Sequence, residues 1–316
     1  MSNLNVPKKK MAPRDAFGRA LEEMGAERDF VVLCADLADA TRAGFFAEKY
    51  PERFIECGIA EANMMSVAAG IATTGTPAVA TTFAMFAAGR AYEQVRNSIA
   101  YPHLNVKIGA THAGLSVGED GATHQCLEDL ALMRELPGMT VLSPCDGPES
   151  GRAIKAALAM DGPVYVRMGR SALDVITEDD AEFTIGKGVV MADGADAVMF
   201  ATGLMVGESL KAREILAERG IDLAVVNIHT IKPIDEELIV SYAKKTGHVF
   251  TAEDHFITGG LGSAVAEVLC EQCPTPLVRI GVKDTFGRSG TFEDLIKVYG
   301  IDAESVANTI EATLKK

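Results

Sequence analysis

The chain has 316 residues, 48% of them hydrophobic and 23% charged, and its 44 acidic against 30 basic side chains give a formal net charge of −14. This composition is rich enough to fill hydrophobic cores and excludes a disordered chain. The negative charge is spread along the sequence, whereas nucleic acids are held by clustered Lys and Arg, so we expect no nucleic-acid partner.

Nothing in the sequence directs the chain to export or to a membrane. The short basic run Lys8–Lys10 is not followed by an apolar signal segment, so we expect a cytoplasmic protein. Residues 62–89 carry no charged side chain and are long enough to span a bilayer. However, the turn at Gly75-Thr76-Pro77 would break a membrane helix, so this stretch predicts a buried helix followed by a buried strand.

From its start, the sequence alternates between helical and strand patterns. Apolar residues at helical spacing between Ala16 and Met24 predict a helix, and the continuous apolar run at residues 31–35 predicts a strand buried on both faces. Further strands are predicted near residues 54–57, 78–82, 106–110, 141–143 and 164–167. This alternation is typical of a parallel α/β sheet.

The acidic, poorly periodic stretch Thr177–Glu182 predicts a linker. A second α/β series follows, with strands near residues 197–201, 223–227, 249–252 and 278–280 and a last helix from about Asp302 to the end. We therefore predict an α/β protein of two domains, residues 11–175 and 186–316, each a mostly parallel sheet flanked by helices.

Cys270 and Cys273 have CxxC spacing, but no second pair is placed to complete a zinc site. We expect both cysteines to pack within a helix, and we expect this chain to supply no metal ligands.

The segment 111–125 carries the densest set of reactive side chains. It contains His112, Glu119, Asp120 and His124 among several glycines, and it follows a predicted buried strand. It should therefore emerge at the carboxyl end of the sheet, where open α/β folds bind ligands. Imidazoles and carboxylates in a glycine-rich loop predict a polar-ligand site. The alternative is a surface loop whose turn residues satisfy one another.

Glu61 stands between a predicted strand and the uncharged stretch that follows it. An acidic residue at this place either begins a helix, where the helix dipole favours it, or is a desolvated carboxyl suited to proton transfer. The residues alone leave both interpretations open.

Together, these segments resemble the pyrimidine-binding domain of transketolases. The matching segments are Ala35-Asp36-Leu37, Gly58-Ile59-Ala60-Glu61, Thr82-Phe83-x-x-Phe86 and the string from Gly118 to Gln125. That last string, Gly-Glu-Asp-Gly-Ala-Thr-His-Gln, is the specific element. Because Gly259–Gly262 and Phe286–Gly290 also resemble the terminal domain of the wider family, the similarity covers nearly the whole chain.

The resemblance implies a thiamine diphosphate enzyme and assigns the cofactor-binding residues. Glu61 matches the catalytic glutamate that hydrogen-bonds the aminopyrimidine ring. Phe83 and Phe86 match the aromatic residues that pack on this ring, and Asp36 matches a residue close to the cofactor.

The resemblance also assigns residues to the substrate. Arg14, His112 and Arg170 match groups around a sugar phosphate, a role suited to fixed charge and forked donors. Asp120 and His124 match residues that contact sugar hydroxyls, with His124 as a catalytic candidate for proton transfer.

Two positions depart from the family pattern. Ala40 stands where many transketolases have a phosphate-binding serine, with Thr41 as a candidate substitute, and Ala62-Asn63 follows Glu61 in place of the common His-Ala. Both departures put the identity of the substrate in doubt.

The Gly-Asp-Gly motif with which full transketolases hold magnesium and the diphosphate does not occur in the sequence. The few residues before Arg14 cannot encode the domain that carries it. We therefore expect a partner, an N-terminal transketolase subunit that binds Mg²⁺ and the diphosphate, and a heterotetramer of two chains of each kind.

The resemblance implies transfer of a two-carbon ketol unit from a ketose phosphate to an aldose phosphate. The nearest alternative is a subunit of a deoxyxylulose phosphate synthase-like or other thiamine diphosphate enzyme; His112 favours a transketolase, because that synthase family usually has Asp-Arg-Ala-Gly at this point. A noncatalytic assembly subunit is a third possibility, although Glu61 and the histidine-bearing loop are both present.

Overall fold

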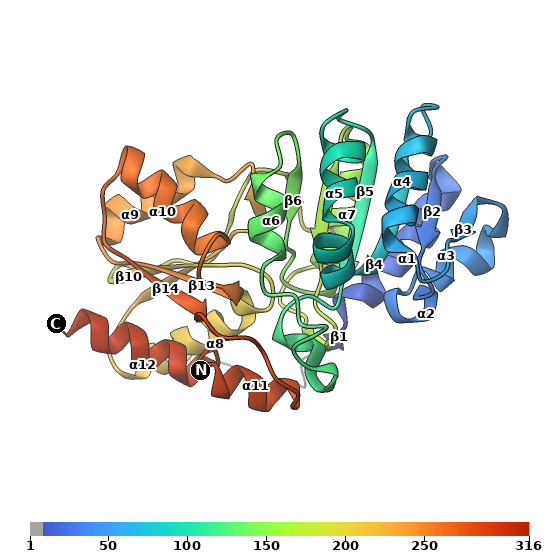
Figure 1. The fold of residues 1–316 in the computed structure, drawn as a ribbon. Coiled ribbons are helices and arrows are strands. Elements are labelled where there is room, and N and C mark those ends of the chain that lie inside the picture. The colour runs from blue at the N-terminus through green and yellow to red at the C-terminus, as the bar shows by residue number, and fades with distance from the viewer. Residues whose placement is uncertain (1–8, 316) are drawn as a thin grey trace.

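The computed structural model describes residues 9–315 and contains two main sheets, side by side, each with helices on both faces (Figure 1). The larger sheet has the strand order β12-β6-β7-β5-β4-β2-β3. Its strands are β2 (Val31–Cys34), β3 (Phe54–Glu56), β4 (Ala78–Phe83), β5 (Val106–Thr111), β6 (Thr140–Leu142), β7 (Val164–Arg167) and β12 (Thr230–Lys232). The pairing is parallel except at the edge, where β12 runs antiparallel to β6.

The second sheet has the order β14-β13-β10-β11-β9, and only its edge strand β9 is antiparallel to its neighbour. Its strands are β9 (Val189–Ala192), β10 (Ala197–Ala201), β11 (Leu223–Asn227), β13 (Val249–Phe256) and β14 (Leu277–Val282). A short antiparallel ribbon joins β1 (Lys10–Met11) to β8 (Leu173–Asp174).

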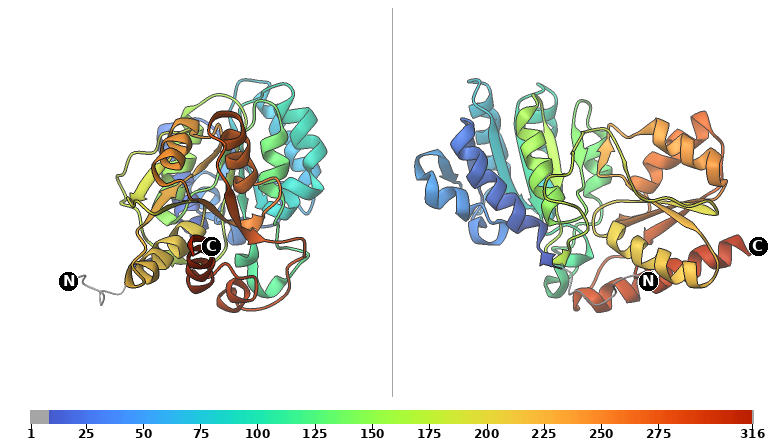
Figure 2. Two further views of the ribbon diagram at one scale, coloured as in Figure 1. Left: turned by 90° about the vertical axis from the view of Figure 1, so that its left-hand side faces the viewer. Right: turned by 180° about the vertical axis from the view of Figure 1, so that it is seen from behind.

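Two helical layers cover the seven-stranded sheet, as the view from behind shows (Figure 2). One layer holds α1 (Pro13–Glu27), α3 (Gly44–Lys49) and α7 (Gly147–Ala159). The other holds α4 (Glu61–Ala72), the π-helical segments η2 (Met85–Arg90) and η3 (Val95–Ala100), α5 (Tyr92–Gln94) and α6 (Asp129–Glu135). The connecting turns are α2 (Ala38–Thr41) and the 3₁₀ segments η1 (Pro51–Arg53) and η4 (Leu115–Asp120).

The continuous apolar runs of the sequence are explained by these two layers. In β2, Val32 belongs to the core under α1 and α7, whereas the next residue, Leu33, belongs to the core under α4. Successive side chains of a strand point to opposite faces, so a strand that is covered on both faces must be apolar at every position.

The second sheet is covered in the same way. Core residues pack α8 (Met205–Glu218), α11 (Phe292–Val298) and α12 (Ala303–Leu314) on one side, and α9 (Glu236–Thr246) and α10 (Leu261–Gln272) on the other. The core under α9 and α10 continues into the core under α4. The two sheets therefore share one hydrophobic cluster.

The predicted fold class, α/β with two mostly parallel sheets flanked by helices, is confirmed. The predicted strands occur within a few residues of their expected bounds, and the expected linker contains neither helix nor strand. β1, β8, β9 and β12 were not predicted. β12 lies in the second predicted domain but completes the sheet of the first.

The two cysteines of the CxxC pair differ in their surroundings. Cys273 packs partly against the core, but Cys270 is exposed, so the expected packing of both cysteines is wrong for Cys270. The uncharged stretch forms α4 and the buried strand β4, as predicted. Within residues 9–315, no helix has the length and apolar character needed to cross a membrane.

Candidate active site

The predicted site residues gather at the carboxyl edge of the seven-stranded sheet. Asp36 follows β2, Phe83 ends β4, and His112 directly follows β5. These parallel strands are neighbours in the order β5-β4-β2, so the segments that leave them emerge at one edge.

Glu61 is the first residue of α4, and its side chain is only 2% exposed. Arg90 Nη1 donates to both carboxylate oxygens, at 3.1 Å to Oε1 and 2.9 Å to Oε2. The negative charge therefore lies at a helix N-terminus, where the dipole favours it, and it is paired by a side chain that the sequence analysis did not select.

An aromatic row connects four of the predicted residues. The rings of Phe83 and His112 are stacked with centroids 3.8 Å apart, and those of Phe83 and Phe86 are stacked at 5.8 Å. His124 approaches Phe86 edge-on at 5.6 Å. These contacts bring both histidines of the glycine-rich loop against the aromatic pair that follows β4.

His112 is buried and has a left-handed backbone conformation, with φ of +57°. Burial, followed by the nearby positive charges of Arg14 and Arg170, lowers its pKa to about 3. The imidazole is therefore neutral at pH 7 and can act as a hydrogen-bonding group but not as a fixed charge. That His112 lies close to a sugar phosphate stays a prediction.

Arg14, Arg42 and Arg170 form a cationic cluster, and two of them, Arg14 and Arg170, lie close to His112. The pKa of Arg14 is lowered by burial and then by the positive charge of Arg42, with Arg170 contributing less. Arg14 donates to the carbonyl oxygen of Ala40 at 2.8 Å, and its buried Nε has no partner among the described residues. An unpaired buried donor in a cluster of positive charges is suited to an anion.

Arg42 was not selected from the sequence. It ends α2 with φ of +66°, and its Nε lies 2.6 Å from Asp15 Oδ1. Thr41, the suggested replacement for the missing serine, is fully buried and its hydroxyl donates to the carbonyl oxygen of Leu37 at 2.9 Å. Thr41 is therefore not available to a ligand, and that suggestion is wrong.

Asp36 and Asp120 lie apart from these contacts. Both are exposed, and within residues 9–315 no side-chain hydrogen bond joins either carboxylate to another predicted site residue. The backbone N–H of Asp36 donates to Glu56 Oε1 at 2.7 Å, which holds its turn, with φ of +59°, against β3.

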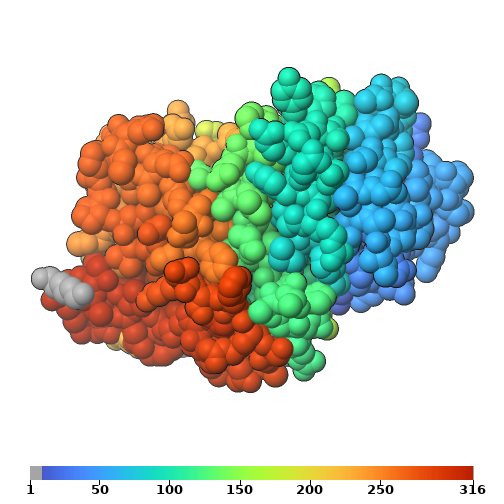
Figure 3. Space-filling model, in the orientation of Figure 1, coloured from blue at the N-terminus to red at the C-terminus, as the bar shows by residue number. Residues whose placement is uncertain are grey.

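The second half of the chain supports the histidine-bearing loop through residues that the sequence analysis missed. Asp254, at the end of β13, accepts a hydrogen bond from the backbone N–H of Leu115 at 3.0 Å. Gln125 Nε2 donates to the carbonyl oxygen of Arg288 at 3.0 Å. Figure 3 shows the green segment around residue 120 in contact with the red-orange segment around residue 285.

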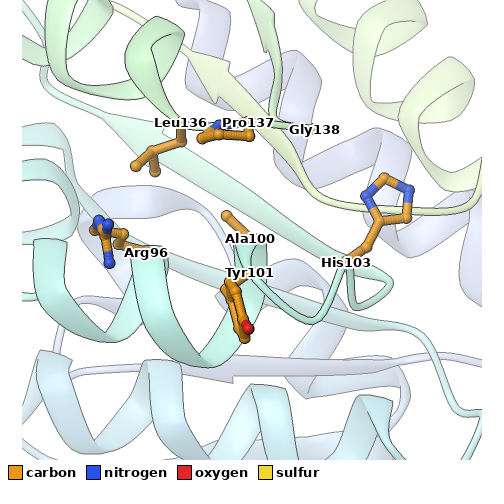
Figure 4. A pocket seen from close by; sticks show the side chains of 7 residues that line it. All are labelled: Arg96, Ala100, Tyr101, His103, Leu136, Pro137 and Gly138. Atoms are coloured by element: carbon orange, nitrogen blue, oxygen red, sulfur yellow. The ribbon is translucent and has the colours of Figure 1, made fainter.

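A concave pocket of about 390 Å³ opens beside the aromatic row. Its lining includes Phe86, Arg90 and Gln125, together with Phe256 and the exposed Phe286 of the second half. A second pocket, of about 310 Å³ and lined by Arg96, Tyr101 and the 136–138 turn, contains none of the predicted site residues (Figure 4). The pocket at Phe86 therefore adjoins the candidate site.

Comparison with known proteins gives two family matches. Residues 9–175 match the family described as transketolase, pyrimidine binding domain, and residues 186–306 match transketolase, C-terminal domain. Arg14, Glu61 and the loop with His112 and His124 all lie in the first matched region.

Individual relatives match over almost the full length of both chains. A protein of Methanocaldococcus jannaschii named as a transketolase C-terminal section is 50% identical over 96% of this chain and 96% of its own. A 6-deoxy-6-sulfo-D-fructose transketolase subunit of Clostridium sp. is 43% identical over 96% and 95%. Among solved structures, a split-gene transketolase, an inactive β4 tetramer, is 47% identical with a TM-score of 0.90 and covers 96% of this chain and 99% of its own.

Proposed function

This chain belongs to the transketolase family, and we propose that it is the pyrimidine-binding subunit of a two-subunit, thiamine diphosphate-dependent transketolase. The reaction we propose is transfer of a two-carbon ketol unit from a ketose phosphate to an aldose phosphate. The observation that carries the proposal is the buried Glu61 carboxylate at the start of α4, beside the row of Phe83, Phe86 and His112.

The residues present fit the aminopyrimidine half of thiamine diphosphate. A ring of this kind needs an aromatic surface and a carboxyl group next to it, and Phe86 and Glu61 offer these, both in contact with Arg90. When bound, the cofactor supplies the electron sink that breaking and forming a carbon–carbon bond requires. Glu61 would hydrogen-bond the ring, and Phe83 would support Phe86 from the aromatic row.

The cationic cluster of Arg14, Arg42 and Arg170 supports an anionic sugar as substrate. Arg170 Nη1 donates to the carbonyl oxygen of Val117 at 2.8 Å, so the arginine is held against the histidine-bearing loop. We infer that the arginines bind the terminal phosphate, that neutral His112 donates or accepts one hydrogen bond there, and that His124 and Asp120 contact the sugar hydroxyls. The name of the Clostridium relative specifies a sulfonated sugar, and a sulfonate presents the same kind of anionic oxygens to arginine.

We further propose that an N-terminal transketolase subunit holds Mg²⁺ and the diphosphate, that the two subunits form a cytoplasmic heterotetramer, and that Asp36 faces the cofactor. The described residues contain no group of His, Cys, Asp and Glu arranged to bind a metal. The inactivity stated for the related split-gene β4 tetramer supports the need for a second kind of subunit.

The test is to purify this chain with its diphosphate-binding partner and to measure ketol transfer in the presence of thiamine diphosphate and Mg²⁺. Glu61→Gln keeps the size of the side chain but loses the ionisable carboxyl, so we expect turnover to fall by at least about 100-fold. Glu48→Gln, at an exposed position on α3, is the matched control. Strong transfer by the Glu61→Gln complex would contradict the role of Glu61, and full activity of this chain alone would contradict the need for a partner.

A further inference from the structure

Arg90 makes both of the contacts that the proposed function assigns to the aminopyrimidine ring. Its Nη1 bonds the two oxygens of Glu61, and its guanidinium carbon lies 4.5 Å from the centroid of the Phe86 ring. A guanidinium is flat, cationic and able to stack on an aromatic face. The Arg90 side chain therefore contacts both the Glu61 carboxylate and the face of the Phe86 ring.

The two partners differ in how deeply they are buried. The side chain of Glu61 is 2% exposed, whereas that of Arg90 is 52% exposed. A buried carboxylate without a partner is costly, so Glu61 needs a positive charge or a hydrogen-bond donor while no ligand is present. Arg90 supplies the positive charge and the hydrogen-bond donor from the solvent side. Because its side chain is long and half-exposed, it can move away from Glu61 without disturbing the core.

The surroundings give Arg90 room to move. The pocket of about 390 Å³ is lined by Arg90 and Phe86 and also by Glu128, which offers a second carboxylate. Arg90 itself is the last residue of the π-helical segment η2, directly after Gly89. Movement of the guanidinium into this pocket would uncover Glu61 and Phe86 together.

We propose that Arg90 is a placeholder for the coenzyme: it pairs with Glu61 and covers Phe86 in the unloaded subunit, and it must be displaced before the aminopyrimidine can bind. This inference rests on the proposed function. Because the Arg90–Glu61 contact competes with the coenzyme, weakening the contact should favour coenzyme binding.

The experiment compares coenzyme binding by complexes of the partner subunit with wild-type chain, Arg90→Gln and Arg96→Gln. Binding of thiamine diphosphate with Mg²⁺ is followed by calorimetry for affinity and by stopped-flow for the association rate. Removal of a competing contact of ordinary strength should tighten binding by about tenfold, because the binding-competent form becomes the major one. Arg96→Gln, on the neighbouring segment η3 and away from Glu61, should bind as the wild type does. Arg90→Lys keeps the charge but loses the flat group, so its affinity for the coenzyme should lie between those of the wild type and Arg90→Gln. This milder variant is the control in case Arg90→Gln does not fold.

A second measurement needs no coenzyme. In the isolated chain, the thermal unfolding of Glu61→Gln, Arg90→Gln and the double variant should show a coupling between the two positions, because each single variant breaks the same ion pair. If the wild-type complex binds the coenzyme and the Arg90→Gln complex binds it no more tightly, or less tightly, the placeholder role is overturned. The proposed function would still stand in that case. Failure of every complex to bind the coenzyme would overturn both proposals.

Discussion

His112 shows how a single residue is defined by its surroundings. The imidazole is buried between Phe83 and the cationic cluster, and its pKa is lowered to about 3 from the ordinary 6.5. In the unfolded chain the imidazole binds a proton below about pH 6.5, whereas in the folded chain it does so only below about pH 3. The stability that the neutral form provides is therefore lost as the pH falls from about 6.5 towards 3.

We predict that His112→Asn reduces the acid sensitivity of the fold. Asparagine tolerates the left-handed backbone at this position and cannot take up the proton. The free energy of unfolding of the wild type should lose about 1.4 kcal/mol per pH unit more than that of the variant between pH 6 and pH 4. Urea unfolding at a series of pH values measures this, with His248→Asn at an exposed histidine as the control for removing an imidazole. Equal slopes for wild type and His112→Asn would contradict the assignment.

At the scale of elements, the histidine-bearing loop takes its shape from the second half of the chain. Gly114 has φ of +74°, and a Cβ atom there would lie 2.0 Å from Asp254 Oδ2. Because Gly114 has no side chain, the Asp254 carboxylate comes close enough to accept a hydrogen bond from the backbone N–H of Leu115. At the other end of the loop, Gln125 is bonded to the carbonyl oxygens of Gly118 and Arg288.

Gly114→Ala should therefore disturb this loop strongly. The added methyl group meets a buried carboxylate, and alanine disfavours a positive φ, so we expect a loss of about 3 kcal/mol in the free energy of unfolding. We also expect a higher KM in the assembled enzyme, because His112 and His124 leave their positions. Gly207→Ala is the control: this glycine lies in α8 with open space around it, and alanine there should stabilise the helix by up to about 1 kcal/mol. If the Gly114→Ala variant is as stable as the wild type, the loop can shift to accommodate the added methyl group, and the prediction is wrong.

A buried polar network in the first half of the molecule reaches the second half through Arg167. Arg167, at the end of β7, pairs with Asp129 at 2.9 Å and donates to the carbonyl oxygen of Asp254 at 2.8 Å. Tyr165 donates to the same carboxylate of Asp129. With β12 completing the first sheet and one hydrophobic cluster shared by both sheets, we expect the two halves to unfold together.

Asp129→Asn tests this expectation. The variant removes the ion-pair partner of the buried Arg167 guanidinium, which typically costs about 3–5 kcal/mol. Calorimetry should show a single transition at a lower temperature, and hydrogen exchange should show β10 and β4 losing protection together. Two separate transitions, with only the first half destabilised, would mean that the halves are independent.

Local pattern was sufficient for the fold class and for the family, whereas the roles of the candidate site residues stay predictions. Runs that are apolar at every position identified the central strands, because only strands covered on both faces need them. The string from Gly118 to Gln125, together with Glu61, identified the family. The division into residues 11–175 and 186–316 stays a prediction, and β12 is the element that crosses it.

Tertiary structure alone decided what these residues meet. Arg90 appears in the sequence only as the first charge after the uncharged stretch, yet it pairs with Glu61. The neutrality of His112, the burial of Thr41 and the support from Asp254 depend on contacts between segments far apart in the chain. The physical reason is that periodicity reports the face that an element buries, whereas charge state and pairing depend on desolvation and on the neighbours that folding brings together.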